Sequence, residues 1–184
     1  MKFSKHIKYL FIKLALFITI AVLIIVFREQ LIEYIDHFIG TLMVVYGIEE
    51  LLSEILFAGK LLLTKDKFYL GIIDILLGVV LIFTKLSYEA TCVIWAAWSI
   101  IRESFEIKDI FAELHVLIPR IVYGIESVVV IVFSIMLIAE PGEHHAMIHL
   151  YLLLAELTLN PLIPLIDEIV CERKEQKEEN KTED

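Results

Sequence analysis

One apolar stretch decides the fold of this chain: residues Tyr9–Phe27, which read YLFIKLALFITIAVLIIVF. These nineteen residues carry one charge, Lys13, and a helix needs about 17–25 mainly apolar residues to cross the hydrocarbon of a bilayer. The basic residues before the stretch are typical of a secretory signal, but it has no small-residue cleavage site and is too long for a signal core. We therefore expect a retained transmembrane helix.

Five more apolar runs follow the first. The chain is 59% hydrophobic with a mean hydropathy of +0.79, whereas soluble domains are about 45–50% apolar. The runs are continuous rather than alternating, which favours helices over the strands of a barrel. The runs predict an all-α integral membrane protein with six transmembrane helices, at approximately Tyr9–Phe27, Phe38–Ala58, Phe68–Thr84, Ala90–Phe105, Ile118–Ala139 and Met147–Val170. Residues 1–170 then form one transmembrane domain, and residues 171–184 a charged tail that is disordered or a frayed helix.

Lysine and arginine are divided unevenly between the two sides of this predicted domain. Cytoplasmic loops of membrane proteins carry the excess of these residues. Of 16 in the chain, 14 lie on the side of the termini, and the opposite side holds only Arg28 and Lys85. We expect both termini in the cytoplasm and the chain in the cell (inner) membrane.

Internal repetition organises the predicted helices. The pentapeptide VYGIE occurs at Val45–Glu49 and again at Val122–Glu126, and residues 46–55 align without gaps with residues 98–107, at an offset of 52. The offset predicts three helical hairpins of about 52 residues, a common way to build membrane proteins. The two pentapeptides lie on predicted helices of opposite direction, so they are not equivalent positions in the repeat.

Small residues and prolines mark particular positions on the helices. Gly40 and Gly47 are seven residues apart, as are Gly71 and Gly78, so each pair lies on one helix face. Such faces predict close helix approaches, within the bundle or between subunits. Asn160 and the two prolines that follow should kink the last helix.

Two segments resemble a known family. They are Tyr69–Ile82 (YLGIIDILLGVVLI) and Tyr46–Leu52 (YGIEELL), and with the hairpin spacing they are similar to the HdeD-type acid-resistance membrane proteins. The resemblance covers residues 9 to 170. It implies a bacterial inner-membrane protein of short two-helix repeats, linked to acid or envelope stress, and it supplies no catalytic residues to carry over. The first helix and the acidic, histidine-bearing last outer loop depart from the family pattern.

Acidic side chains within the predicted spans are costly in lipid, so each needs a partner, a proton or a water-filled cavity. The cations at similar depth are Lys13, Arg102 and Arg120, which the acids outnumber. Either the acids pair between helices and fix their register, or they form the proton or cation path of a small channel or transporter. The candidate acid layer consists of Glu49, Glu50, Glu54, Asp74, Glu126 and Glu156, with Glu103 and Glu106 as further acids at similar depth.

Histidines in the last outer loop form a second candidate site. His145 and His149 are spaced i,i+4, so on a helix they could share a metal ion, with Glu140, Glu143 or His144 nearby. Histidine also titrates near neutral pH, which suits an acid sensor. A polar loop at the level of the lipid headgroups is the third interpretation.

Other classes of function find no support in the sequence. It contains no CxxC, HExxH, P-loop or GxSxG motif, so we expect neither an enzyme nor a cofactor. No basic stripe is present, which argues against nucleic-acid binding. The expected partners are the lipid bilayer, a possible homo-oligomer, and a protein bound through the cytoplasmic tail, as in an accessory subunit of a larger complex.

Overall fold

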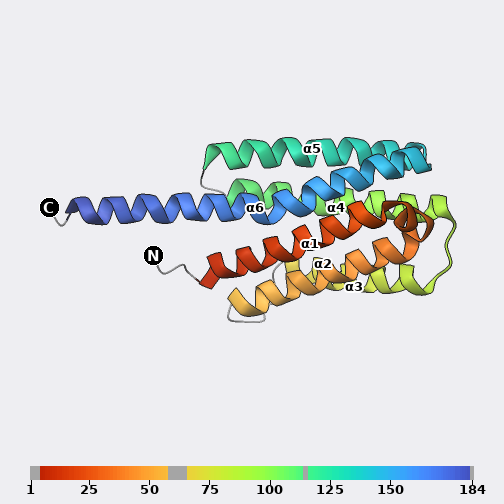
Figure 1. Cartoon of the computed structure of the whole chain (residues 1–184), viewed down its shortest axis with the longest axis horizontal. Helices are drawn as coiled ribbons and strands as arrows, with labels where there is room; N and C mark the ends of the chain where they lie inside the picture. Colours follow the sequence, from red (N-terminus) through yellow and green to blue (C-terminus); the bar gives the residue numbers. More distant parts are fainter. Residues whose placement is uncertain (1–4, 58–65, 114–115, 183–184) are drawn as a thin grey trace. The chain divides into compact units, whose positions relative to one another are not determined.

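The computed structural model describes residues 5–57, 66–113 and 116–182, and its regular structure is helical. That part of the chain contains no strand, which confirms the all-α class there. Ala58, the predicted end of the second span, lies outside the described residues. Figure 1 shows the helices, which are α1 Lys5–Glu33, α2 Ile35–Phe57, α3 Asp66–Phe83, α4 Tyr88–Glu113, α5 Leu117–Ala139 and α6 Glu143–Thr182.

Three of these helices are long and apolar enough to cross a membrane. They are α1 over Ile7–Glu33, α5 over Leu117–Ala139, and α6 over Glu143–Cys171. The apolar part of α3, Phe68–Phe83, is shorter. The helices α2 and α4 are long enough, but both contain several of the acids identified above. The three apolar helices are consistent with a membrane protein.

The chain divides into two compact units, residues 28–95 and residues 1–27 with 96–184. One boundary falls in α1 at Phe27, whose backbone is non-helical at φ −108° and ψ 16°. The other falls within α4, between Trp95 and Ala96. Each unit is described by itself below.

In the unit of residues 28–95, α2 and α3 pack against each other through glycines (Figure 1). A Cβ atom added to Gly40 would lie 2.7 Å from the carbonyl oxygen of Gly78, and one added to Gly71 would lie 3.0 Å from that of Gly47. Such distances leave no room for a side chain, so the two backbones touch. The predicted close approach of these glycines is confirmed, and it lies within the chain.

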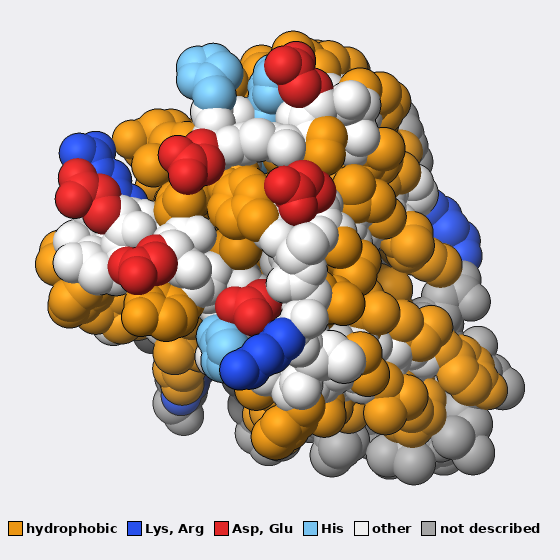
Figure 2. Space-filling view, turned by 90° about the vertical axis from the view of Figure 1, so that its right-hand side faces the viewer, with side chains coloured by type: hydrophobic (Ala, Val, Ile, Leu, Met, Phe, Trp, Pro, Cys, Tyr) orange, Lys and Arg blue, Asp and Glu red, His pale blue; other side chains and the backbone are white. Residues whose placement is uncertain are grey.

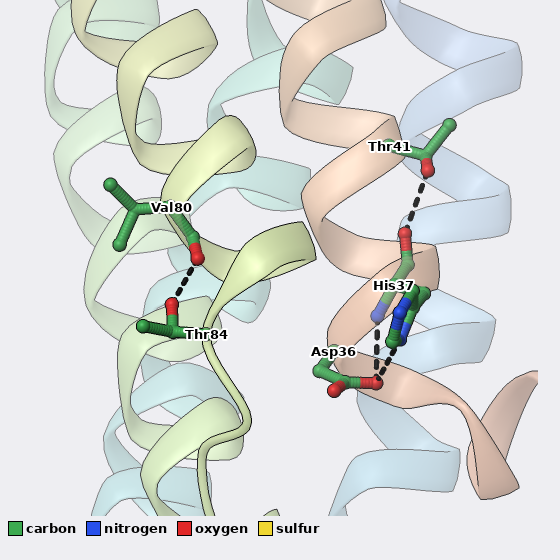
Figure 3. Close-up of polar contacts among 5 residues, drawn as sticks. All are labelled: Asp36, His37, Thr41, Val80 and Thr84. Atoms are coloured by element: carbon green, nitrogen blue, oxygen red, sulfur yellow. Dashed lines mark hydrogen bonds and ion pairs between the residues drawn. The ribbon is translucent and has the colours of Figure 1, made fainter.

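Polar side chains near one end of this hairpin bond to their own helices (Figure 3). Thr41 Oγ1 donates to the carbonyl oxygen of His37 at 2.7 Å, and Thr84 Oγ1 donates to that of Val80. Asp36 Oδ1 accepts the backbone N–H of His37 at 2.8 Å and lies 2.8 Å from the Nδ1 atom of its ring. Hydroxyls bonded in this way need no partner on another helix.

In the other unit, α6 organises the packing. Its Leu165 is buried in a cluster with Ile7 and Leu10 of α1. The carboxylate of Asp167 accepts the backbone N–H of Val116 at 2.7 Å, which satisfies a donor at the start of α5.

Helix α6 is also longer than the predicted span. It continues through the charged tail to Thr182, with Pro161 and Pro164 inside it. Of the two alternatives for the tail, the structure therefore has the helical one.

Candidate functional site

Glu106 of α4 is the centre of a polar cluster inside the unit of residues 1–27 and 96–184. Arg102 Nη2 donates to Glu106 Oε1 at 3.3 Å, and the hydroxyl of Tyr123 on α5 donates to Oε2 at 2.6 Å. Asn160 Nδ2 on α6 donates to the two oxygens at 3.2 and 3.3 Å. One carboxylate thus joins α4, α5 and α6. We name Arg102, Glu106, Tyr123 and Asn160 the Glu106 cluster.

Arg102 is a buried cation, with 3% of its surface exposed. Its partner Glu106 lies one helical turn away, and its guanidinium carbon lies 5.3 Å from the centroid of the Trp98 ring. An aromatic face attracts a cation, and burial of a charge is tolerated only where it is paired and hydrogen-bonded. Arg102 therefore pairs with a part-buried acid on its own helix.

Buried hydroxyls extend from the Glu106 cluster along α5. Tyr123, Ser127 and Ser134 all lie on the buried face of this helix, at spacings of four and seven residues that keep them on one side. From Tyr123 to Ser134 the helix rises about 16 Å at 1.5 Å per residue. Polar groups therefore follow the interior of this unit over about half the thickness of a bilayer core.

Polar groups on α4 and α6 accompany those of α5. Ser99 Oγ of α4 lies 3.1 Å from the Nε2 atom of His149 on α6, and both side chains are buried. Glu103 of α4 and Glu156 of α6 are also buried, at 1% and 4% exposure. We name the polar track the Glu106 cluster together with Ser99, Glu103, Ser127, Ser134, His149 and Glu156.

Three oxygens of the polar track and one beside it, on Glu126, are buried without a hydrogen-bond partner among the described residues. They are Glu103 Oε2, Glu126 Oε1, Ser127 Oγ and Ser134 Oγ. A buried polar atom left without a partner is destabilising unless a proton, a water or an ion satisfies it. Carboxyl, hydroxyl and imidazole groups in series are also the materials of proton relays in membrane proteins.

The predicted acid layer is divided between the two units. Glu49, Glu50 and Asp74 belong to residues 28–95, where Asp74 is fully buried, whereas Glu126 and Glu156 belong to the other unit. Glu54 lies on α2, but its side chain is outside the described part of the structure. The structure describes no single site that contains all six acids.

The two remaining candidate cations have different surroundings. The ammonium of Lys13 lies 5.5 Å from the centroid of the Phe17 ring on its own helix. Arg120 is half-buried and borders a groove on the outside of α5.

The two histidines proposed as a metal pair have different partners. His149 is buried beside Ser99, whereas His145 Nδ1 lies 3.1 Å from the carbonyl oxygen of Glu140. Among the described residues no group of three histidines, cysteines or acids is placed to hold a metal ion. Figure 2 shows acidic and histidine side chains among hydrophobic ones on the face that it draws. The described residues therefore give no support to the metal site, and the acid sensor and the polar loop both stay predictions.

Sequence reasoning missed two members of the Glu106 cluster. Tyr123 belongs to the second VYGIE pentapeptide, in which the predicted site residue is Glu126, three residues later. For Asn160 and the two prolines that follow it, the sequence predicts only a kink in the helix. The available signal was weak: a tyrosine and an asparagine inside apolar runs are polar groups that need partners. Their common partner, Glu106, lies 17 and 54 residues away.

Comparisons with known proteins do not place the chain in a family. No family model matches the chain, and no curated protein and no solved structure matches it. The class defined here is an all-helical chain, over its described residues, with three helices able to cross a membrane and a buried polar track.

Proposed function

We propose that the chain is a non-enzymatic, multi-pass inner-membrane protein of the HdeD-like kind, in which the polar track holds the transmembrane helices in register. In this proposal all six helices span the membrane as three hairpins, with both termini in the cytoplasm. The three long apolar helices support it directly. The glycine packing of α2 and α3 supports a membrane hairpin, because small residues let helices approach in lipid.

The observation that carries this function is the saturation of Glu106. Its carboxylate accepts four hydrogen bonds from three side chains on α4, α5 and α6. A group used in chemistry needs room for a substrate, whereas this one is filled by the protein itself. Bonds of this kind fix the rotation of each helix about its axis, because slippage of any helix would leave a buried donor without an acceptor.

Labelling from outside the cell tests the membrane arrangement. In a variant lacking Cys92 and Cys171, single cysteines would replace Lys85, Glu140 or Lys108, and intact cells would be treated with a membrane-impermeant thiol reagent. We expect labelling at positions 85 and 140 only, with position 108 labelled after the cells are opened. Labelling of position 108 in intact cells would contradict the six-span arrangement.

The role in acid or envelope stress rests on the sequence resemblance. Survival of cells lacking the chain, measured after exposure to low pH with and without the restored gene, tests it. Equal survival of the two strains would exclude an acid-stress role. The labelling experiment does not depend on this result.

Buried carboxylate oxygens in and beside the polar track favour a second candidate function, a proton path. Glu103 Oε2 and Glu126 Oε1 are buried without hydrogen-bond partners among the described residues, so each can take up a proton. Proton flux into liposomes containing the full chain would fall in Glu103→Gln and Glu126→Gln, and would be unchanged in the exposed control Glu89→Gln. Absence of flux in the wild-type protein, or equal flux in all variants, would exclude the path.

A further inference from the structure

A shallow groove runs along the outside of α5. Arg120 and Gly124, one helical turn apart, both line it. The rest of its lining is aliphatic, and most of these residues are more than half exposed. They include Leu117, Ile121, Ile125 and Val128. The groove is therefore apolar along its length and has one cationic group near the start of the helix.

Gly124 differs from the glycines of the α2–α3 contact. A Cβ atom added to Gly124 meets no other atom within 4 Å, whereas one added to Gly40 or Gly71 would press on the facing helix. Glycine within a helix is destabilising relative to alanine, because it loses more backbone freedom on folding. Among the residues that the structure describes, no packing explains Gly124, and the missing side chain leaves the outer face of α5 hollow beside Arg120.

We propose that this groove binds one anionic phospholipid, with an acyl chain over Gly124 and the phosphate at the guanidinium of Arg120. The proposal rests on α5 crossing the membrane. Arg120 is the fourth residue of α5, so it lies within about 5 Å of the start of the helix at 1.5 Å per residue, at the level of lipid headgroups. A guanidinium has five N–H donors, so Arg120 can bind a phosphate and keep its contacts within the chain.

The charge of the groove selects the occupant. A zwitterionic lipid would satisfy the apolar lining equally well, but a cation at one end favours a headgroup with net negative charge. In the proposed topology this end faces the cytoplasm, where anionic lipids give the membrane surface its negative potential. A lysine or arginine near such a surface is worth about fivefold in affinity.

Native mass spectrometry of the full chain in detergent tests the proposal. Phosphatidylglycerol and phosphatidylcholine with identical acyl chains would be titrated separately. We expect wild type to bind phosphatidylglycerol more tightly, Arg120→Gln to lose about fivefold in that affinity, and Arg120→Lys to retain most of it. Gly124→Leu should weaken both lipids by filling the groove, and Val132→Leu, on the same helix beyond the groove, should weaken neither.

Two results would overturn the proposal. One is undiminished phosphatidylglycerol binding by Arg120→Gln. The other is a Gly124→Leu variant that binds lipid normally but changes the number of copies per particle, because the groove would then hold a second copy of this chain. Membrane fractionation of the same variants reports separately whether the chain is in the membrane, so failure of lipid binding and failure of the membrane assignment are distinguishable.

Discussion

Replacement of Glu106 by alanine should be among the most destabilising single changes in the polar track. The change removes the acceptor of four hydrogen bonds and leaves Arg102, whose side chain is 4% exposed, without its ion-pair partner. Removal of one partner from a buried ion pair costs about 3–5 kcal/mol. Hydrogen bonds between membrane helices average only about 0.6 kcal/mol each, so the lost ion pair of the buried Arg102 charge dominates the decrease in stability. We expect a decrease of about 3–5 kcal/mol in the free energy of unfolding.

Equilibrium unfolding of the full chain in mixed micelles, with increasing dodecyl sulfate, measures this quantity. A matched control is Glu89→Ala, which removes an exposed carboxylate from the first turn of the same helix. The double variant Arg102→Met, Glu106→Leu should recover much of the stability, because replacement of both members of a buried pair by apolar groups is often neutral. A loss below about 1 kcal/mol in Glu106→Ala, where surface substitutions usually fall, or a double variant less stable than the single one, would refute the reasoning.

Two further predictions concern other parts of the chain. Gly47→Ala places a methyl group against the backbone of Gly71 and should destabilise the α2–α3 hairpin by about 1–3 kcal/mol, whereas Gly124→Ala fills open space and should cause no loss; equal effects in the micelle assay would contradict this difference. Burial raises the pKa of Asp36, but hydrogen bonds from the ring and backbone of His37 outweigh it and hold that pKa below its usual value of 3.8. The resulting stabilisation is present above about pH 4 and lost as the pH falls through the lowered pKa, so the stability difference between wild type and Asp36→Asn should shrink in that range; a difference that stays constant to pH 2 would disprove it.

The parts of the fold that depend on local periodicity follow from the sequence. Two glycines seven residues apart lie on one face of any helix, so a close approach at Gly40 and Gly47 could be predicted from the sequence, but not the helix that they contact. The structure shows that the contact is antiparallel, Gly40 with Gly78 and Gly47 with Gly71. The long apolar runs likewise predict α1, α5 and α6, because length and hydropathy suffice to recognise a span.

The candidate site depends on how helices are rotated against one another, which a single sequence does not reveal. The i,i+4 spacing of His145 and His149 places them on one side of α6, but the packing of α4 brings Ser99 to His149 instead. Arg102 could be identified as a buried cation, yet its partner is one of eight acids at similar depth. Only the structure distinguishes them.

The continuation of α6 through the charged tail is explained by local helix propensity, although the tail has no apolar residues to bury. The tail after Cys171 has nothing apolar to bury, which predicts disorder or fraying. Glutamate and lysine are nevertheless strong helix formers, and extension of an existing helix avoids the cost of nucleation. The apolar part of α6 supplies the nucleus, so the helix continues to Thr182.

The glycine contact between α2 and α3 bears on how relatives of this chain would diverge. Main-chain atoms make the contact, so it requires a very small residue at four positions. The neighbouring positions can exchange one apolar residue for another. Chains that keep the hairpin can therefore lose overall sequence identity while retaining two glycines seven residues apart in each of two consecutive helices. That spacing, Gly-x6-Gly followed by Gly-x6-Gly about 24 residues after the second glycine, is the pattern by which distant members of the same lineage should be recognisable.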